Sequence, residues 1–263
     1  MPMNNILKFL FIFLIILCLC FIIFPIFHIF ITLCVKRLLK TLYDREVWMA
    51  ILTSFEGACL ATILGCILGV PIAYLLSRYE FIGKRLLESI VNLPIAIPHV
   101  AVGIALLSFL NERTVLGNLF LKFHITFVDT IYGVVIAMAF VSISYVITSA
   151  LIGFNATPRE LEMVSRSLGA SAPYTFFHIV LPLSMPAIIR GAILAFARSV
   201  SEIGALLILS YYPKTAPIIM YERFEQYGLE AARPVTALVV FLSLLIFFLL
   251  LFLSQKRWAS ARG

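Results

Sequence analysis

The sequence predicts an all-α integral membrane protein that crosses the bilayer about six times. Hydrophobic residues make up 62% of the 263 residues and charged residues only 13%, whereas a soluble domain has roughly 45–50% and about 25%. So little polar surface cannot cover so apolar a core, so lipid must replace water around much of the chain. Because the length leaves no room for a separate soluble domain, we expect residues 1–263 to form a single transmembrane domain.

Six apolar stretches are long enough to cross about 30 Å of hydrocarbon, which takes about 20 helical residues. They cover residues 9–35, 51–77, 90–110, 131–154, 186–209 and 235–253. The first is too long for the apolar core of a signal peptide, and no small-x-small cleavage site follows it. Lys and Arg are divided evenly between the loops on the two sides, so the positive-inside rule does not orient the chain.

Small residues recur at every fourth position in two spans, a pattern that lets helix backbones approach closely in lipid. They are Gly57, Ala61, Gly65 and Gly69 in the second span, and Gly191, Ala195 and Ser199 in the fifth. We interpret them as packing within the chain rather than as a subunit interface. The five cysteines lie in apolar runs without metal-ligand spacing, and we interpret them as packing residues: Cys18, Cys20, Cys34, Cys59 and Cys66.

The polar segment after the fourth span carries several helix-capping signals. Thr157 and Glu160 predict a capping box, with Pro158 at the first helical position. Gly169 is expected to end this helix in a left-handed cap, and Ser171 to cap a second short helix before the fifth span. Two capped helices around a fixed glycine suit a rigid knob outside the bilayer that fits a groove on another protein.

The same segment resembles the EAA loop of ABC importer permeases. The resemblance rests on the run from Glu162 to Gly169, followed at the family's spacing by Ile-x-Leu-Pro at 179–182; Val164 and Ser165 replace two alanines, and Glu162 lies one place early. In that family the loop is the coupling helix that docks on a cytoplasmic ATPase, which implies that loop 154–182 and both termini are cytoplasmic. The resemblance implies a coupling role for Glu160, Glu162, Arg166, Gly169, Ala170, Ile179, Leu181 and Pro182.

Two further stretches narrow the family. Residues 92–103 (Asn-Leu-Pro-Ile-Ala-Ile-Pro-His-Val-Ala-Val-Gly) and 197–205 (Ala-Arg-Ser-Val-Ser-Glu-Ile-Gly-Ala), with Tyr211-Tyr212-Pro213 beyond, resemble the molybdate/tungstate permeases, and the similarity runs from about residue 45 to 253. Sulfate/thiosulfate permeases are the nearest alternative. The resemblance implies the type I ABC importer permease fold in the cell membrane. It also implies alternating access by a homodimer with two ATPase subunits, which carry the ATP and magnesium, and an external binding protein that delivers the oxyanion.

The residues themselves exclude other classes. No Gly-x4-Gly-Lys-Ser/Thr occurs, so the chain has no phosphate-binding loop and cannot hydrolyse ATP itself. No nucleophile–base pair has suitable spacing, so we do not expect an enzyme, and the basic residues form no stripe for nucleic acid. A channel or ion-driven carrier would need intramembrane acids in several helices, whereas Glu202 is the one carboxylate expected deep in a span.

Ionisable groups within spans are the best pathway candidates, because each costs about 2.5–3.5 kcal/mol at mid-bilayer. Arg198 and Glu202, one turn apart, form either an intrahelical ion pair or a charged site facing the pathway. Prolines at the start of the third span are expected to free backbone carbonyls, and His99 to bond one of these in preference to an anion. The candidates are Pro94, Pro98, His99, Arg198, Ser199, Ser201 and Glu202.

Two further features are expected near the membrane surface. Glu56 should lie at the outer interface rather than in the pathway. Residues 217–227, which end at Gly228, predict an amphipathic interfacial helix with an aromatic belt, and this helix is a candidate docking surface for the external binding protein.

Overall fold

The computed structural model describes residues 5–259 of the chain, with side chains over 7–254, and this part is helical without strands. The long helices are α1 (Asn5–Ile31), α3 (Arg45–Arg78), α7 (Ile131–Ala156), α10 (Leu181–Val200) and α13 (Leu229–Ala259). The short ones are α2 (Val35–Leu42), α4 (Lys84–Ala96), α5 (His99–Leu110), α6 (Val115–Leu121), α8 (Arg159–Ser167), α9 (Ala172–Thr175), the π-helical turn η1 (Phe176–Val180), α11 (Leu206–Leu209) and α12 (Ala216–Tyr227).

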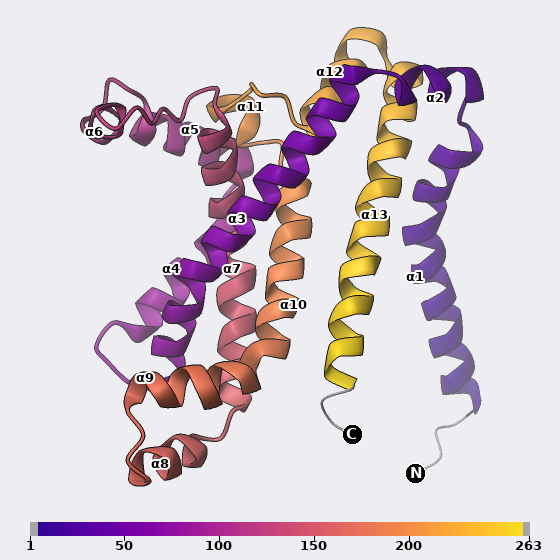
Figure 1. The fold of residues 1–263 in the computed structure, drawn as a ribbon. Coiled ribbons are helices and arrows are strands. Elements are labelled where there is room, and N and C mark those ends of the chain that lie inside the picture. The colour runs from indigo at the N-terminus through magenta and orange to yellow at the C-terminus, as the bar shows by residue number, and fades with distance from the viewer. Residues whose placement is uncertain (1–4, 260–263) are drawn as a thin grey trace.

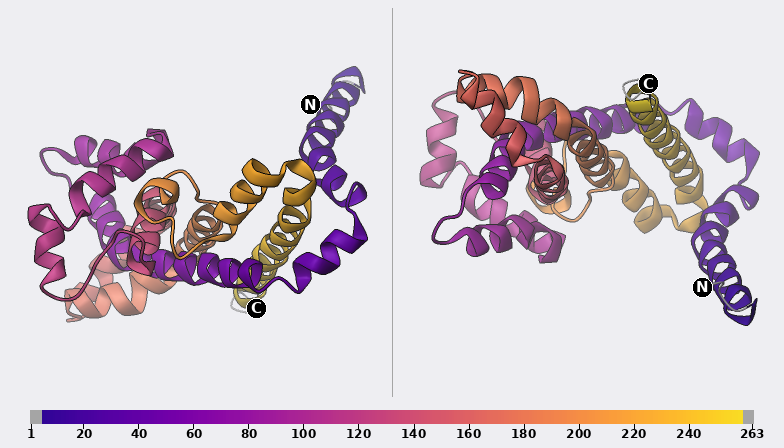
Figure 2. Two further views of the ribbon diagram at one scale, coloured as in Figure 1. Left: turned by 90° about the horizontal axis from the view of Figure 1, so that it is seen from above. Right: turned by 90° about the horizontal axis from the view of Figure 1, so that it is seen from below.

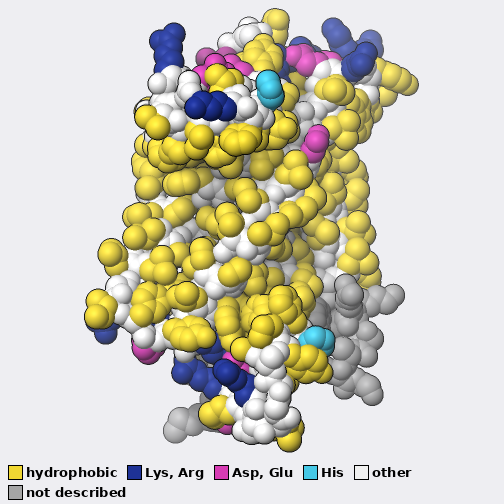
Figure 3. Space-filling model, turned by 60° about the vertical axis from the view of Figure 1, so that its left-hand side comes forward, with side chains coloured by type: hydrophobic (Ala, Val, Ile, Leu, Met, Phe, Trp, Pro, Cys, Tyr) yellow, Lys and Arg dark blue, Asp and Glu magenta, His cyan; other side chains and the backbone are white. Residues whose placement is uncertain are grey.

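Within the described residues, five helical stretches are long and apolar enough to cross a membrane, and α4 with α5 can form a sixth, broken span. The predicted membrane class is therefore confirmed. Hydrophobic side chains form a broad band across the face in view, with most of the visible charged side chains at its two ends (Figure 3). Helices α8 and α9 lie at one end, where α1 begins and α13 ends. Helices α2, α6, α11 and α12 lie at the other end (Figure 1). The termini themselves, residues 1–4 and 260–263, fall outside the described residues.

The third span is interrupted between α4 and α5, at the prolines that were expected to free backbone carbonyls at its start. α4 and α5 are bent by 111° to one another. Pro98 has no N–H for a helical bond and holds Ile97 in an extended conformation (φ −80°, ψ 133°), as the residue before proline prefers. Pro94, by contrast, is buried inside α4 and does not end it. Only one of the two prolines therefore breaks the helix.

Other boundaries also differ from the expectation. The fifth span ends at Val200, and residues 201–205 separate it from α11. The first helix ends at Ile31, and a short turn leads into α2. The break after Ile31 falls inside apolar sequence, where hydropathy alone gives no reason to stop a helix, whereas residues 201–205 include Ser201, Glu202 and Gly204.

The core is a bundle of α3, α7 and α10 (Figure 1). A Cβ added at Gly69 would come 2.9 Å from Ile147 of α7, and one at Gly191 would come 2.6 Å from the Ser149 Cβ and 3.0 Å from a backbone oxygen of α7. Ser199 is buried and donates a hydrogen bond to the same helix. Both small-residue stripes therefore pack within the chain, as predicted.

α1 is the exception to this packing. Its apolar stretch Leu7–Ile31 has no buried residue, and the helix lies at the edge of the molecule beyond α13 (Figure 2). The cysteines follow the same trend, because four of the five are exposed and Cys66 is half-buried. The interpretation of the cysteines as packing residues was therefore wrong for those four, because their side chains lie on the outer surface of the chain.

Candidate functional site

Three ionisable side chains meet where the broken spans approach each other, and we call His99, Arg198 and Glu202 the charged cluster. Glu202 lies in the break after α10 and is only 1% exposed. Its Oε2 accepts hydrogen bonds from Arg198 Nη2 at 2.8 Å and from His99 Nδ1 at 2.7 Å. Its Oε1 accepts from the backbone N–H of Ala205 at 2.8 Å. Three donors therefore hold the carboxylate. A buried carboxylate needs such partners because it has lost its contacts with water.

Two glycines bring these elements together. A Cβ at Gly204 would come 2.6 Å from the His99 Cβ, and one at Gly103 would come 2.7 Å from the backbone oxygen of Ala205. Because these neighbours are backbone or Cβ atoms, neither glycine can be enlarged without moving α5 away from residues 202–205. Pro98 then starts α5 so that His99 stands at its first turn.

The predicted Arg198–Glu202 pair is confirmed, although Glu202 lies beyond the helix end and not one turn along it. The expectation for His99 was wrong: its ring contacts the Glu202 carboxylate and the Arg198 guanidinium rather than a freed carbonyl. Arg198 Nη2 lies 2.5 Å from His99 Nδ1 and 2.8 Å from His99 Nε2, so the guanidinium packs against the edge of the imidazole ring. The carboxylate that His99 contacts lies in the break after α10, 103 residues further along the chain, so the sequence around His99 does not reveal it.

The remaining pathway candidates divide into two groups. Ser201 is exposed and accepts a hydrogen bond from Arg198 Nη1 at 3.3 Å, so it belongs with the charged cluster. Ser199 and Pro94 are buried against other elements and do not join it. Glu56 is exposed on α3.

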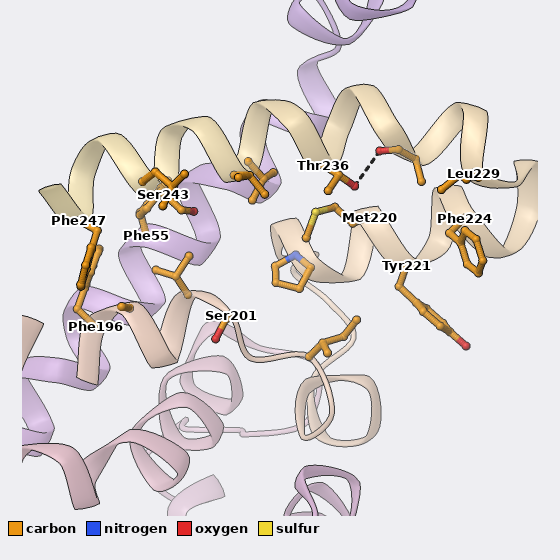
Figure 4. Close-up of a pocket in the computed structure, with 18 residues that line it drawn as sticks. Phe55, Phe196, Ser201, Met220, Tyr221, Phe224, Leu229, Thr236, Ser243 and Phe247 are labelled. Atoms are coloured by element: carbon orange, nitrogen blue, oxygen red, sulfur yellow. Dashed lines mark hydrogen bonds between the residues drawn. The ribbon is translucent and has the colours of Figure 1, made fainter. Parts of the chain in front are cut away.

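A cavity of about 750 Å³ opens beside the charged cluster, between α3, α10, α12 and α13. Phe196 and Phe247 lie at one end, Tyr221 and Phe224 at the other, and Ser201 on the rim between them (Figure 4). Sequence reasoning missed this cavity, because each helix alone shows only an apolar face. Ser201, which accepts a hydrogen bond from Arg198, therefore connects the charged cluster to an almost wholly apolar space.

The second candidate site is the knob, which we define as residues 157–182 with α8, α9 and η1. Gly169 ends α8 with a φ of +91°. The N–H of Ala170 donates to Ser165 O at 3.1 Å, and that of Gly169 to Arg166 O at 3.0 Å, which is the bonding pattern of a Schellman cap. Ser171 caps α9 by accepting from Tyr174 N. Both of these local predictions are confirmed.

The capping box at the start of the knob was wrongly predicted. Pro158 occupies the cap position and no side chain caps α8. The Thr157 hydroxyl is buried, donates to Gly153 O at 3.1 Å and contacts the Ser184 hydroxyl at 3.0 Å. It is used to join α7 to α10, so it is not available to α8.

The knob carries a groove of about 790 Å³ between α8 and α9. It is lined by Leu161, Val164, Ser165, Leu168, Gly169, Ala170, Ser171, Tyr174 and Ile179. The Ser165 hydroxyl, which stands at an alanine position of the resembled motif, is buried and contacts the Thr175 hydroxyl at 3.0 Å. This departure from the motif therefore joins the two helices of the knob.

Three of the coupling candidates, Gly169, Ala170 and Ile179, line this groove. Glu160 and Arg166 are exposed on α8, and Leu181 and Pro182 begin α10. Glu162 is different, because its carboxylate turns inward toward α3 and is paired with Arg78. The structure thus brings three of the eight candidates into the groove and turns Glu162 toward α3.

Comparison with known proteins agrees with this architecture. Residues 61–259 match the family model described as binding-protein-dependent transport system inner membrane component. The chain belongs to this family. It is therefore a multi-pass permease of an ABC importer.

The molybdate/tungstate transport system permease protein WtpB of Pyrococcus furiosus is 40% identical to this permease over 241 residues, which are 91% of this chain and 89% of the relative. The probable sulfate transport system permease protein cysT of Nephroselmis olivacea is 35% identical and covers 73% of this chain and 69% of its own. The predicted resemblance to the molybdate/tungstate permeases is confirmed.

Among solved structures, a bacterial ABC transporter involved in the import of the acidic polysaccharide alginate matches with a TM-score of 0.74 over 95% of each chain. Its sequence identity of 17% means that the similarity shows the fold alone. The expected fold of ABC importer permeases is confirmed.

The end of the permease opposite the knob carries a network of ion pairs. Lys214 contacts Glu46 at 2.8 Å and Glu222 at 2.7 Å, and Arg223 contacts Glu46 and Asp44 at 3.0 Å. Burial by itself lowers the pKa of the Lys214 ammonium, but hydrogen bonds to the two glutamates outweigh it and raise that pKa above its ordinary value. The network fixes α12 to the start of α3.

α12 is the helix that the sequence predicted over residues 217–227. It covers Ala216–Tyr227 and ends at Gly228, whose φ is +75°. Its aromatic residues Tyr221, Phe224 and Tyr227 are exposed. The exposed rings beside an anchored polar face agree with an interfacial helix.

Proposed function

We propose that this permease forms the translocation pathway of an ATP-driven importer for molybdate and tungstate. The observation that carries the proposal is the 40% identity to a protein named as a molybdate/tungstate permease, over nine-tenths of the chain. Sulfate is the second candidate, because a relative named as a probable sulfate permease is 35% identical over a shorter part of the chain.

The working complex in this proposal contains two copies of the chain, two ATPase subunits and an external binding protein. The ATPase subunits dock on the knob and carry the ATP and magnesium, so the knob and both termini are cytoplasmic. The exposed apolar groove around Gly169 supports this role, because a rigid, capped and unfilled groove offers a surface for another protein. The binding protein docks at the opposite end, where α12 presents its aromatic rings.

The charged cluster supplies the chemistry for an anion in the pathway. Arg198 has five N–H donors, and in this structure they contact Glu202, His99 and Ser201. A tetrahedral dianion competes with the Glu202 carboxylate for the guanidinium, so attraction is balanced by repulsion. Binding that is favourable but weak lets the anion enter and leave.

Transport follows by alternating access. ATP draws the ATPase subunits together, and the knobs carry this movement to the pair of permeases, whose pathway then opens outward to receive the oxyanion. Hydrolysis separates the ATPases and opens the pathway inward. Each step shifts a two-state equilibrium by differential binding.

The test is reconstitution. The permease is purified from its native membrane with its soluble subunits, placed in liposomes with the binding protein, and supplied with labelled tungstate, molybdate or sulfate. We expect uptake that requires internal ATP and that prefers tungstate and molybdate. Preferred uptake of sulfate would make sulfate the substrate. Uptake without any ATPase would refute an ATP-driven importer.

A further inference from the structure

Arg78, the last residue of α3, joins three segments at the end of the molecule that carries the knob. Its Nη1 donates to Phe154 O at 2.9 Å and its Nη2 to Thr157 O at 3.1 Å, while its Nε donates to the Glu162 carboxylate. Phe154 lies in the last turn of α7, where helix carbonyls lack partners within the helix. One guanidinium therefore caps α7, bonds the connection to the knob and pairs with α8.

A return contact comes from the knob. Arg159, the first residue of α8, donates from Nη2 to Ser77 O at 2.7 Å, so it caps the end of α3 as Arg78 caps the end of α7. The Ser77 hydroxyl also donates to Asn155 Oδ1 at 2.6 Å. The ends of α3, α7 and α8 are thus bonded reciprocally.

Glu162 is enclosed by this arrangement. The Arg78 side chain is 7% exposed and that of Glu162 is 16% exposed. The second carboxylate oxygen of Glu162 accepts a hydrogen bond from the Tyr74 hydroxyl at 3.1 Å. Both oxygens therefore have partners within the chain and face α3 rather than the groove of the knob.

We propose that Arg78 and Glu162 form an internal clamp that fixes the angle of α8 against the α3–α7 pair, so that Glu162 is a positioning residue for coupling and not a contact to the ATPase. The inference rests on the proposed function for its effect on transport, although the clamp itself is a property of the chain alone. Movement imposed on α8 then passes to α3 through a part-buried ion pair and two backbone caps. A loosely attached knob would absorb that movement instead.

The first measurement uses the permease alone in nanodiscs. Hydrogen–deuterium exchange is followed at the backbone amides of 159–168 in wild type, Glu162→Gln and Arg78→Lys. Glutamine at 162 keeps a hydrogen-bond acceptor but loses the negative charge. Lysine at 78 keeps the positive charge but lacks the planar guanidinium that bonds Phe154 O, Thr157 O and Glu162 together. We expect exchange at least tenfold faster in both variants, because local opening follows local stability.

Glu80→Gln is the matched control. Glu80 pairs with Lys84 at 2.7 Å at the same end of the molecule, but in an exposed loop outside the knob. It should leave exchange in α8 unchanged. Wild-type exchange in both Glu162→Gln and Arg78→Lys would overturn the clamp, and if one variant fails to fold, the other decides.

The second measurement uses the assembled importer in liposomes. We expect Glu162→Gln to retain the ATPase on co-purification but to transport at least fivefold less oxyanion per ATP hydrolysed. A merely structural loss would lower transport and hydrolysis together and leave their ratio unchanged, which would overturn the positioning role. Loss of the ATPase with normal exchange in α8 would also overturn it, because Glu162 would then be a direct contact.

Failure of the proposed function has a different signature. A wild-type chain that recovers no ATPase and imports no oxyanion would refute the importer, while the exchange of the isolated chain would still decide whether the clamp exists.

Discussion

Gly169 offers the sharpest test of the knob. Its φ is +91°, and a Cβ added there would meet no atom within 4 Å. A substitution is therefore unfavourable only through the backbone, because a left-handed conformation costs an L-residue roughly 1–2 kcal/mol. That free energy corresponds to a factor of about 5 to 30 in the population of the capped knob. Where binding requires this conformation, the apparent Kd for the ATPase rises by up to the same factor.

The assay is a titration of the permease in nanodiscs with purified ATPase, followed by transport in liposomes. Gly169→Ala should weaken binding by up to about 5- to 30-fold, Gly169→Asn should weaken it less because asparagine tolerates this conformation, and Gly169→Val should abolish transport.

Gly83 supplies the matched control, since its φ is +92° and its Cβ position is equally open, but it lies in the loop before α4. Gly83→Ala should leave the Kd unchanged. Wild-type binding and transport by Gly169→Val would refute a docking role for the capped glycine.

Three further predictions concern the bundle and its charges. Arg198→Gln should reduce oxyanion uptake at least tenfold while the complex still assembles, whereas Arg190→Gln, an exposed site on the same helix, should not; equal uptake by both would remove Arg198 from the mechanism. Gly191→Ala should lower the free energy of unfolding in detergent by about 1–3 kcal/mol through overpacking. Gly65→Ala, whose Cβ would lie 3.6 Å from its nearest neighbour, should leave that free energy unchanged. Equal free energies of unfolding for the two variants would refute the close packing of α10 on α7. Lys214→Gln should lower that free energy by about 1–3 kcal/mol, since two carboxylates lose a partner. Because the pKa of Lys214 is raised, its contribution is complete below the ordinary value of about 10.4 and is lost as the pH rises through the raised pKa; an unfolding profile in which Lys214→Gln matches wild type at pH 8 would contradict it.

The helical membrane class, most of the spans and the end of α8 could be predicted because their causes are local. Apolar length measures the bilayer directly, and Gly169 and Ser171 act on backbone groups within a few residues. The family motifs are also local runs, so the resemblance located the knob before any packing was considered.

The errors arose where a local group has a distant partner. Thr157 has the right neighbours for a capping box, but its hydroxyl is taken by α7 and α10. Glu162 reads as an exposed helix residue, yet its partner Arg78 is 84 positions away in the chain. The breaks at residues 97–98 and 201–205 are about 100 positions apart in the chain, so only packing shows that they face each other.

The sequence by itself thus determined that the chain lies in the membrane, roughly where it crosses and which segment forms the knob. Hydropathy and turn chemistry specify these features within a window of one helix. Only the tertiary structure decided that His99 joins the Arg198–Glu202 pair and that Glu162 faces inward. Those contacts depend on the close approach of backbones at Gly103 and Gly204 and on helix ends that meet. Which charged side chains pair across many residues of sequence is set by which helices pack together.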